Sequence, residues 1–461
     1  MLCFAAAEIA QITNGRLLCG SEELMADNVV IDSRQASCGS LFAAFNGESA
    51  DGHDFLESAL AAGARIALIS DTARLEELMA LAQQRGAALI LVADMLTALS
   101  DLARANRARL RIPVIGITGS SGKTSTKELL ASALSQSLRV VATWANHNNE
   151  LGVPLTILRA GEDTQALIVE MGMRAAGEIA HLAQLAAPTI GIITSIGLSH
   201  IETLGSPAAI AAAKAELLAA LPTSGLAIYP DNTGFTPLLE AACAAQRTLM
   251  TGTGPAADYY LTDAATDAQG CVSAVIHTPG SKMRVALGIP GAHMMANALL
   301  VCAAAQELGL ADGAIVRGLE AAHTVGLRLA WIEAPGRGVR ILADAYNANP
   351  DSMAAALHTF AESAPTHPQG RRVVVLGDML ELGDTSADAH RAVLALAQEL
   401  GLECLFVFGS QFCAVASPEV AYDDREALIS ALRSFLHPGD IVLVKGSRGM
   451  RMERVIEALQ A

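Results

Sequence analysis

The chain has 461 residues, of which 52% are hydrophobic and only 4% aromatic, and its formal net charge is −16. This length favours about three domains of roughly 150 residues, and the alanine-rich composition is typical of globular α/β proteins and excludes a disordered chain. The acidic excess excludes a broad binding surface for nucleic acid or anionic membranes, because no basic block offsets it.

The eight cysteines are scattered without a CxxC pair, so we interpret them as thiols of a reducing compartment rather than zinc ligands. The first residues lack the basic segment of a signal peptide and carry Glu8. Apolar runs stay shorter than a membrane span, since Lys214 and Glu216 interrupt the alanine-rich stretch in the middle of the chain. We therefore expect a cytoplasmic protein that is not inserted in a membrane. We separately expect a monomer, although the sequence does not determine the oligomeric state.

Residues 1–110 alternate short apolar strands with helical stretches, which predicts a small α/β domain. The expected strands are 29–31, 41–45, 66–69 and 89–92, and the expected helix is 54–62. Two polar clusters follow strands, one with Ser33 and Arg34 and one with Asn46, Gly47 and His53. They are either ordinary turns or an anion site that uses Arg34 and a nearby helix N-terminus. Composition leaves both interpretations open.

A second domain is predicted for residues 111–324, and it opens on IPVIGITGSSGKTSTK at 112–127. This stretch predicts a buried parallel strand, a glycine loop and a helix that begins at Lys123. In such a loop the backbone N–H groups approach phosphates, Lys123 reaches the β and γ oxygens, and Thr124 would hold magnesium. The candidate ATP-binding residues of the loop are Gly119, Ser120, Ser121, Gly122, Lys123, Thr124 and Ser125.

The loop GITGSSGKTS departs from the strict P-loop pattern, which has a glycine at the position of Ile117. It resembles the loop of the Mur ligases and folylpolyglutamate synthases, which are amide ligases that join a carboxylate to an amine. In the first domain, DSR and LFAAFNGESADGHDF resemble the UDP-binding domain of the Mur ligases. The resemblance implies UDP-substrate binding by a set of first-domain residues, namely Ser33, Arg34, Asn46, Gly47 and His53.

Two polar residues follow neighbouring predicted strands of the central domain. Glu170 ends the strand at 166–169, and His200 follows the strand at 189–193. The carboxyl ends of parallel strands face the ligand crevice, so the two residues predict a magnesium pair. Oxygen ligands suit Mg²⁺ better than imidazole, and a polar loop histidine is the alternative for His200.

Lys214 lies in an alanine-rich helix predicted for 207–221. It is either a solvated lysine or, as the resemblance implies, a carbamylated lysine that binds the metal. The resemblance thus implies a catalytic set of Lys123, Glu170, His200 and Lys214, and a metal-binding set of Thr124, Glu170, His200 and, if carbamylated, Lys214.

The stretch from Pro290 to Asn297 resembles a family motif that contacts adenine and ribose, through His293 and Asn297. Asn297 could equally cap a helix. In the linker at 323–329 the match rests on Arg328, and the resemblance adds Arg328 and Asp344 to the ATP-binding set.

Residues 325–461 predict a third, Rossmann-like α/β domain with strands at 339–343, 372–376, 404–408 and 441–444. Polar clusters follow the first, second and fourth of these strands, which marks a binding face. Among Mur ligases, DAYNANPDS and LGDMLELG resemble the branch that joins D-alanyl-D-alanine to UDP-N-acetylmuramoyl-tripeptide. The acceptor-side candidates are Tyr346, Asn347 and Asn349.

The resemblance spans the three predicted domains and implies an ATP- and Mg²⁺-dependent ligase that acts on small molecules through an acyl phosphate. A sister Mur ligase or a folylpolyglutamate synthase-like ligase is the alternative enzyme. A nucleotide-gated regulatory protein is the alternative from another class, and the presence of Lys123, Glu170, His200 and Lys214 argues against it. The third residue of the tripeptide, diaminopimelate or lysine, stays open.

Overall fold

The computed structural model describes residues 3–47, 50–324 and 326–461. The chain is an α/β protein that divides into two compact units. The first comprises Met1–Gly116, Leu138–Met173 and Ile179–Ile190, and the second comprises Ile117–Ser137, Arg174–Glu178 and Gly191–Ala461. Val325, where the third domain is predicted to begin, lies outside the described residues, so the boundaries near residues 110 and 324 stay predictions.

The N-terminal part of the first unit contains a five-stranded sheet in the order β2-β7-β6-β5-β4. Strands β4 to β7 are parallel, and β2 joins β7 antiparallel. The four predicted strands are confirmed. The elements are β1 (Phe4–Ala5), α1 (Ala6–Ile12), β2 (Arg16–Cys19), β3 (Met25–Ala26), β4 (Asn28–Val30), η1 (Ser33–Gln35), β5 (Ser40–Ala43), η2 (Gly52–Phe55), α2 (Leu56–Ala61), β6 (Ile66–Ile69), α3 (Leu75–Gln84), β7 (Ala88–Leu91) and α4 (Met95–Arg109).

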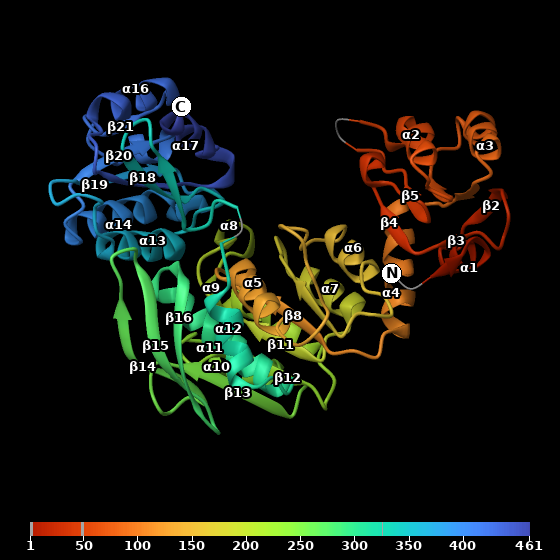
Figure 1. Cartoon of the computed structure of the whole chain (residues 1–461), viewed down its shortest axis with the longest axis horizontal. Coiled ribbons are helices and arrows are strands. Elements are labelled where there is room, and N and C mark those ends of the chain that lie inside the picture. Colours follow the sequence, from red (N-terminus) through yellow and green to blue (C-terminus); the bar gives the residue numbers. More distant parts are fainter. Residues whose placement is uncertain (1–2, 48–49, 325) are drawn as a thin grey trace. The chain divides into compact units, whose positions relative to one another are not determined.

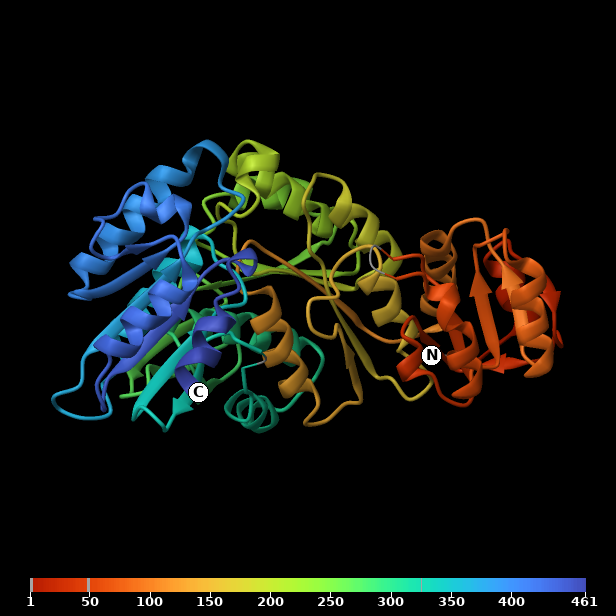
Figure 2. The same cartoon turned by 90° about the horizontal axis from the view of Figure 1, so that it is seen from above.

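Helices flank both sides of these strands, which are red and orange in Figure 2. Helices α2 and α3 pack on one face, where Phe42 and Ile69 of the sheet meet Leu56 and Leu78 of the helices in one buried cluster.

The rest of the first unit includes β9 (Val140–Ala142), α6 (Gly152–Leu158), β10 (Ala166–Glu170) and most of α7 (Glu178–Ala186). Strands β9 and β10 are parallel. The fully buried Asn106 of α4 donates to the carbonyl oxygens of Ile157 and Ala160 at 2.9 Å each, and so ties α4 to the end of α6. A buried amide with two acceptors is satisfied and stabilises this contact.

Strand β8 crosses from the first unit into the second, in which α5 follows it. Strands β12 to β16 lie side by side in chain order. The elements of this part are β8 (Val114–Thr118), α5 (Lys123–Leu134), β11 (Ile190–Ile193), α8 (Ile201–Leu204), α9 (Pro207–Ala219), β12 (Leu226–Pro230), α10 (Thr236–Ala242), β13 (Arg247–Gly252), β14 (Tyr259–Thr266), β15 (Cys271–His277), β16 (Lys282–Pro290), α11 (Ala292–Glu307) and α12 (Asp312–Glu320).

The last strands of this sheet are antiparallel, β14 with β15 and β15 with β16. Sequence analysis predicts no strands there. Their burial alternates along the chain, because one face packs inward and the other is exposed. This alternation with a period of two is visible in the sequence and could have predicted the strands.

The C-terminal part of the second unit is a six-stranded sheet in the order β17-β18-β22-β19-β20-β21. All neighbours are parallel except β17 with β18. The four predicted strands are confirmed. The elements are β17 (Ala330–Ala334), β18 (Val339–Asp344), α13 (Pro350–Glu362), β19 (Arg372–Gly377), η3 (Gly383–Thr385), α14 (Ser386–Glu399), β20 (Cys404–Phe408), α15 (Ser410–Cys413), β21 (Ala421–Tyr422), α16 (Arg425–Phe435), β22 (Ile441–Lys445), η4 (Arg448–Met450) and α17 (Glu453–Gln460).

Helices α13 and α14 cover one face of this sheet, and α16 and α17 cover the other (Figure 1). Successive side chains of β19 point to opposite faces, so Val373 and Val375 join the α16 and α17 side while Val374 and Leu376 join the α13 and α14 side. Strands buried on both faces read as continuous apolar runs, which is why the sequence predicts them well. Within the described part of the chain, no helix is long and apolar enough to cross a bilayer.

Candidate functional site

The glycine loop between β8 and α5 is held by the segment that follows β11. The N–H of Ser120 donates to the carbonyl oxygen of Ser195, and the N–H of Ser121 donates to Ser195 Oγ, both at 2.9 Å. The N–H of Gly197 donates to Ser120 Oγ at 2.8 Å. These bonds set the shape of the loop from within the protein.

Two positions of the loop require glycine, because the backbone has a positive φ angle and neighbouring atoms leave no room for a side chain. Gly119 and Gly122 have φ angles of 153° and 84°. A Cβ on Gly119 would collide with Thr194 Oγ1, and a Cβ on Gly122 would lie 2.8 Å from Asn297 Oδ1. The loop therefore packs too tightly for side chains at either position, and Asn297 of α11 lies directly against it.

Helix α5 begins at Lys123, as predicted. Lys123 Nζ donates to the carbonyl oxygen of Gly119 at 2.6 Å, so the side chain folds back over the glycine loop. Thr124 is buried in the first turn of the helix. A helix N-terminus with a lysine held over a glycine loop is the arrangement that binds a nucleotide phosphate chain.

Lys214 is 1% exposed on α9, so the interpretation as a solvated lysine is wrong. The side chain is therefore enclosed by neighbouring residues rather than exposed on the face of an alanine-rich helix. Burial, followed by the positive charge of Lys123, lowers the pKa of Lys214 well below its ordinary value. A neutral amine carries the lone pair that reaction with CO₂ requires, so burial favours the carbamylation that the resemblance implies.

His200 caps the short helix α8 with a left-handed backbone, φ 65°. Its Nδ1 lies 3.0 Å from Glu381 Oε2 on the loop after β19. Burial lowers the pKa of His200, and the carboxylate of Glu381 opposes this. Sequence reasoning missed Glu381 as a site residue, although the polar cluster after β19 pointed to its loop.

Glu170 ends β10 in the first unit and is 1% exposed. Its Oε1 accepts from Asn148 Nδ2 at 2.8 Å, and its N–H donates to Thr143 Oγ1 at 2.9 Å. Asn148 comes from the amide-rich loop after β9, which sequence analysis did not assign. That amide orients the carboxylate, as partners of metal ligands commonly do.

The predicted magnesium ligands lie on both units, with Glu170 on the first and Thr124 on the second, so the metal set stays a prediction. Among the described residues, no group of three or more His, Cys, Asp or Glu side chains could hold a metal ion. Magnesium bound with a nucleotide usually takes one or two protein oxygens plus phosphate oxygens and water, and the Thr124 hydroxyl at the glycine loop is such an oxygen. Lys214 fits only as a carbamate, because an ammonium group has no lone pair.

Two further candidates of the ATP-binding set lie near the start of α11. Burial lowers the pKa of His293 to about 4, with Asp344 opposing the shift. The residue that caps α11 is Gly291, and Asn297 lies farther along the helix, so the interpretation of Asn297 as a cap is wrong. The proximity of Asn297 to Gly122 keeps it available to a nucleotide in the glycine loop.

Asp344 and Lys445 form a buried ion pair at the ends of the adjacent strands β18 and β22, with Lys445 Nζ 2.5 Å from Asp344 Oδ2. Lys445 Nζ also donates to the carbonyl oxygen of Asn347 at 3.1 Å. The pair sets the path of the loop after β18, which carries the acceptor-side candidates. The role of Asp344 toward ATP stays a prediction.

The acceptor-side candidates contact residues from other parts of the second unit. The guanidinium Cζ of Arg328 lies 3.7 Å from the centre of the Tyr346 ring. Asn349 caps α13 through Ser352, and its Nδ2 donates to Ser121 Oγ at 3.2 Å and Ser199 Oγ at 2.5 Å. Asn349 therefore links the first turn of α13 to the glycine loop.

A cavity of about 200 Å³ lies where these segments meet. Its lining includes Lys123 of α5, His200 before α8, Asn347 after β18, Glu381 after β19 and Arg448 after β22. The structure thus brings predicted nucleotide-binding and acceptor-side residues to one cavity.

In the first unit, Arg34 lies on the short helix η1, with its side chain 87% exposed. Its Nη2 lies 2.6 Å from Asp32 Oδ2, and its N–H donates to Asp32 Oδ1 at 3.0 Å. Ser33 is its neighbour on the same turn. Asn46 forms a single β-bridge with Asp51, and Gly47 N–H donates to the carbonyl oxygen of Ala50. The UDP-binding roles of these residues stay predictions.

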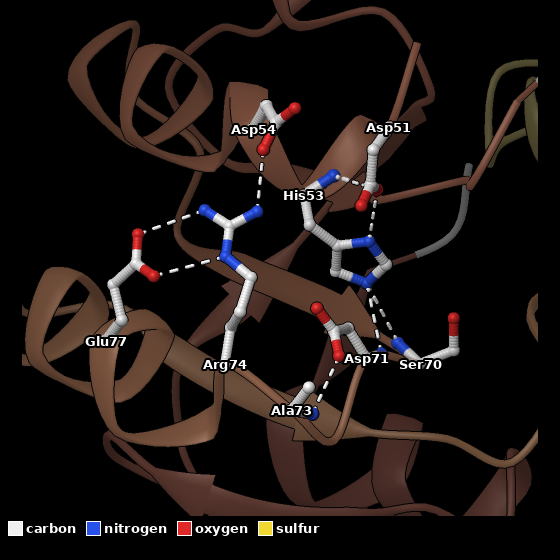
Figure 3. A network of polar contacts seen from close by, with 8 residues as sticks. All are labelled: Asp51, His53, Asp54, Ser70, Asp71, Ala73, Arg74 and Glu77. Atoms are coloured by element: carbon white, nitrogen blue, oxygen red, sulfur yellow. Dashed lines mark hydrogen bonds and ion pairs between the residues drawn. The ribbon is translucent and has the colours of Figure 1, made fainter.

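His53 is buried at 3% exposure, with both ring nitrogens bonded within the protein (Figure 3). Its Nε2 accepts from the N–H groups of Ser70 and Asp71 at 3.1 and 3.2 Å. Nδ1 therefore carries the proton and donates to Asp51 Oδ1 at 2.6 Å. The ring clamps the loop after β5 to the end of β6, and its role in substrate binding stays a prediction.

We expect His53→Ala to lower the free energy of unfolding by about 2 to 4 kcal/mol, because two buried N–H groups lose their acceptor and a cavity forms. Chemical denaturation of the full chain, followed by a probe in the first unit, measures the loss. Arg74→Ala is the matched control from the same network. Arg74 pairs with Asp54 and Glu77 at the surface, so its loss should shift the transition far less. Equal effects would contradict the clamp.

Comparison with known protein families matches most of the chain. Residues 26–107 match the model "Mur ligase family, catalytic domain", residues 117–305 the Mur ligase middle domain, and residues 327–448 the "Mur ligase, glutamate ligase domain". The chain belongs to the Mur ligase family. The regions matched in this Mur ligase correspond to the three predicted domains in order.

Individual relatives are similar to this Mur ligase over nearly its full length. The chain is 36% identical to the UDP-N-acetylmuramoyl-tripeptide–D-alanyl-D-alanine ligase of Bacillus subtilis, over 98% of this chain and 97% of that protein. The crystal structure of MurF from Acinetobacter baumannii is similar with a TM-score of 0.83 and 29% identity, over 99% of both chains. MurF ligase from Thermotoga maritima, in complex with ADP, is similar with a TM-score of 0.76 and 27% identity, over 94% of this chain and 97% of that one.

Proposed function

We propose that this Mur ligase is an ATP-dependent amide ligase that joins D-alanyl-D-alanine to UDP-N-acetylmuramoyl-tripeptide and makes the pentapeptide precursor of peptidoglycan. The observation that carries the proposal is the link from Asn349, in the acceptor-side motif, to Ser121 of the glycine loop. It connects a nucleotide site with a second reactant's site, as a ligase requires. Full-length relatives named for this reaction support it.

The chemistry explains why both sites are needed. A carboxylate does not acylate an amine at neutral pH, because an oxide would have to leave. A carboxylate oxygen of the tripeptide therefore attacks the γ-phosphorus of ATP, ADP leaves, and an acyl phosphate forms. The amine of D-alanyl-D-alanine then attacks the acyl carbon, phosphate leaves, and the amine loses a proton.

The residues of the glycine loop serve the first of these steps. Phosphoryl transfer depends mainly on positioning and on neutralising charge, and Lys123 with the N–H groups of the loop supplies positive charge there. Magnesium bound with ATP would add charge neutralisation, and Thr124, next to Lys123 on the same helix, would be a protein ligand. Asn349 donates to both Ser121 and Ser199, so the acceptor-side loop is held against the glycine loop.

The compartment and the partners are part of the proposal. The cysteines are free thiols, which suits the reducing cytoplasm. The net charge of −16 supports small-molecule substrates rather than nucleic acid. We propose a monomer, and sedimentation of the purified protein tests this.

The deciding experiment for the function is ATP turnover with the substrates supplied singly and together. We expect ADP release only when UDP-tripeptide and D-alanyl-D-alanine are both present, with an equal amount of pentapeptide formed. Turnover with a folate and glutamate instead would indicate a folylpolyglutamate synthase-like ligase. Nucleotide binding without turnover would indicate a regulatory protein. A panel of diaminopimelate- and lysine-containing tripeptides identifies the third residue.

We expect Arg34→Ala to raise the KM for UDP-tripeptide with little change in kcat, because a contact to the remote diphosphate acts equally in the ground and transition states. The exposed guanidinium beside Asp32 supports this role. Steady-state kinetics with varied UDP-tripeptide measures the effect. Arg104→Ala is a matched control, since Arg104 also pairs with an aspartate at 2.6 Å on the same unit. A fall in kcat without a change in KM would contradict the assignment.

A further inference from the structure

This inference rests on the proposed function and concerns how the acceptor is held. D-alanyl-D-alanine carries an ammonium group at one end, a carboxylate at the other and two methyl groups between them. Desolvating either charge without a partner is costly, so a specific site must offer an anion and a cation separated by apolar surface. The cavity between the loops after β18, β19 and β22 offers these groups.

Arg448 supplies the cation. Its backbone N–H donates to Asn347 Oδ1 at 3.3 Å, which holds the loop after β22 against the loop after β18. Its guanidinium Cζ lies 5.7 Å from the centre of the Tyr346 ring, and the residue lines the cavity. No described carboxylate forms an ion pair with Arg448, whereas the neighbouring Lys445 is paired with Asp344. A guanidinium group matches a carboxylate through two parallel hydrogen bonds.

Glu381 supplies the anion, and it is the one acidic residue among the described residues that line the cavity. Its backbone is left-handed, φ 63°, a costly conformation for a non-glycine residue. The side chain is 66% exposed, and Oε2 contacts His200 Nδ1. The exposed carboxylate therefore has room for a positively charged partner.

Apolar residues line the same cavity as these two charges. Leu380 is 42% exposed and lines the cavity together with Leu382 and Gly449. The N–H of Leu380 donates to Ser447 Oγ at 2.9 Å, which ties the loop after β19 to the loop after β22. A Cβ on Gly449 would lie 2.8 Å from Leu380 Cδ1, so the leucine side chain packs directly against the glycine backbone.

We propose that Arg448 binds the carboxylate of the acceptor dipeptide and Glu381 binds its ammonium group, so that the cavity selects short zwitterionic peptides. Leu380 contacts the methyl groups between the two charges. This selection excludes longer peptides, because the ammonium and carboxylate would no longer reach both partners.

The first test compares D-alanyl-D-alanine with its C-terminal amide, which lacks the negative charge. We expect the wild-type enzyme to prefer the acid by about 10- to 150-fold in kcat/KM, the range for hydrogen bonds to a charged group. Arg448→Ala should abolish this preference by raising the KM for the acid while leaving kcat/KM for the amide nearly unchanged. Arg448→Lys should keep part of the preference, because lysine retains the positive charge but cannot make two parallel hydrogen bonds to the carboxylate.

The second test addresses Glu381 with a dipeptide analogue that carries a hydroxyl in place of the ammonium group, used as a competitive inhibitor. We expect the wild-type enzyme to bind D-alanyl-D-alanine more tightly than the analogue. Glu381→Gln should reduce this difference by about tenfold or more. An unchanged difference would overturn the role of Glu381.

Arg454→Ala is the control, because Arg454 is exposed on α17 and does not line the cavity. Its preference for the acid should equal that of the wild type. The acid and the amide are measured on one preparation. Partial unfolding of a variant therefore lowers both apparent kcat/KM values by the same factor and leaves their ratio unchanged. A preference retained in Arg448→Ala would overturn this inference while the proposed function stands. Failure of the wild-type enzyme to ligate D-alanyl-D-alanine would instead overturn the proposed function.

Discussion

Replacing Lys123 by alanine should lower kcat for ligation by a factor of about 10² to 10³ or more, the usual cost of removing a group that stabilises charge in the transition state. Lys123 Nζ already lies against Gly119 of the glycine loop, so its charge is held where the phosphoryl group transfers. Single-turnover measurement of ADP formation isolates the chemical step from substrate binding.

Binding of UDP-tripeptide to Lys123→Ala, measured by calorimetry, should stay close to that of the wild type. The predicted uridine pocket around Arg34 belongs to the first unit, and Lys123 belongs to the second. Lys282→Ala, which removes an exposed cation of the second unit, is the control and should keep full activity. Comparable loss of ligation and of UDP-tripeptide binding in Lys123→Ala would contradict this division of roles.

Lys214→Ala should be nearly inactive, and added acetate or propionate should partly restore its activity. The pKa of Lys214 lies well below its ordinary value because the side chain is buried and faces the charge of Lys123. A lowered pKa favours the neutral amine, which can form a carbamate, and the oxygens of a carbamate suit magnesium. A short carboxylate can enter the space that the truncated side chain leaves and replace those oxygens.

Added alkylamines test whether Lys214 acts as a metal-binding carbamate or as a cation. They would restore a positive charge but no oxygen ligand, so we expect that they do not rescue Lys214→Ala. Mass spectrometry of the wild-type protein under bicarbonate, compared with Lys214→Ala, detects the added carbamate independently of activity. Rescue by amines with no response to carboxylates would show that Lys214 acts as an ammonium group.

Much of the fold follows from local sequence patterns. Strands such as β19 and β22 are buried on both faces, and their continuous apolar runs are visible without a structure. The glycine loop is equally local, because Gly119 and Gly122 need backbone conformations that other residues rarely adopt. Polar clusters at strand ends likewise indicate the loops that form the cavity.

Local patterns were insufficient where two interpretations depended on distant packing. Lys214 in an alanine-rich helix has the same sequence context whether it is solvated or buried, and only the packing of α9 decided that it is buried. The sequence around His53 is compatible with either an ordinary turn or a ligand site. Its ring nitrogens bond to Asp51 and to the N–H groups of Ser70 and Asp71, and the latter two lie beyond a helix and a strand.

The sequence by itself determined the family, the order of the predicted domains and the phosphate-binding loop, because each depends on residues close together in the chain. Only the tertiary structure decided which polar groups share a cavity. Asn349 meets Ser121, and Glu381 meets His200, across long stretches of sequence. Such contacts arise when strands and helices pack around a common core, and no local spacing of residues encodes them.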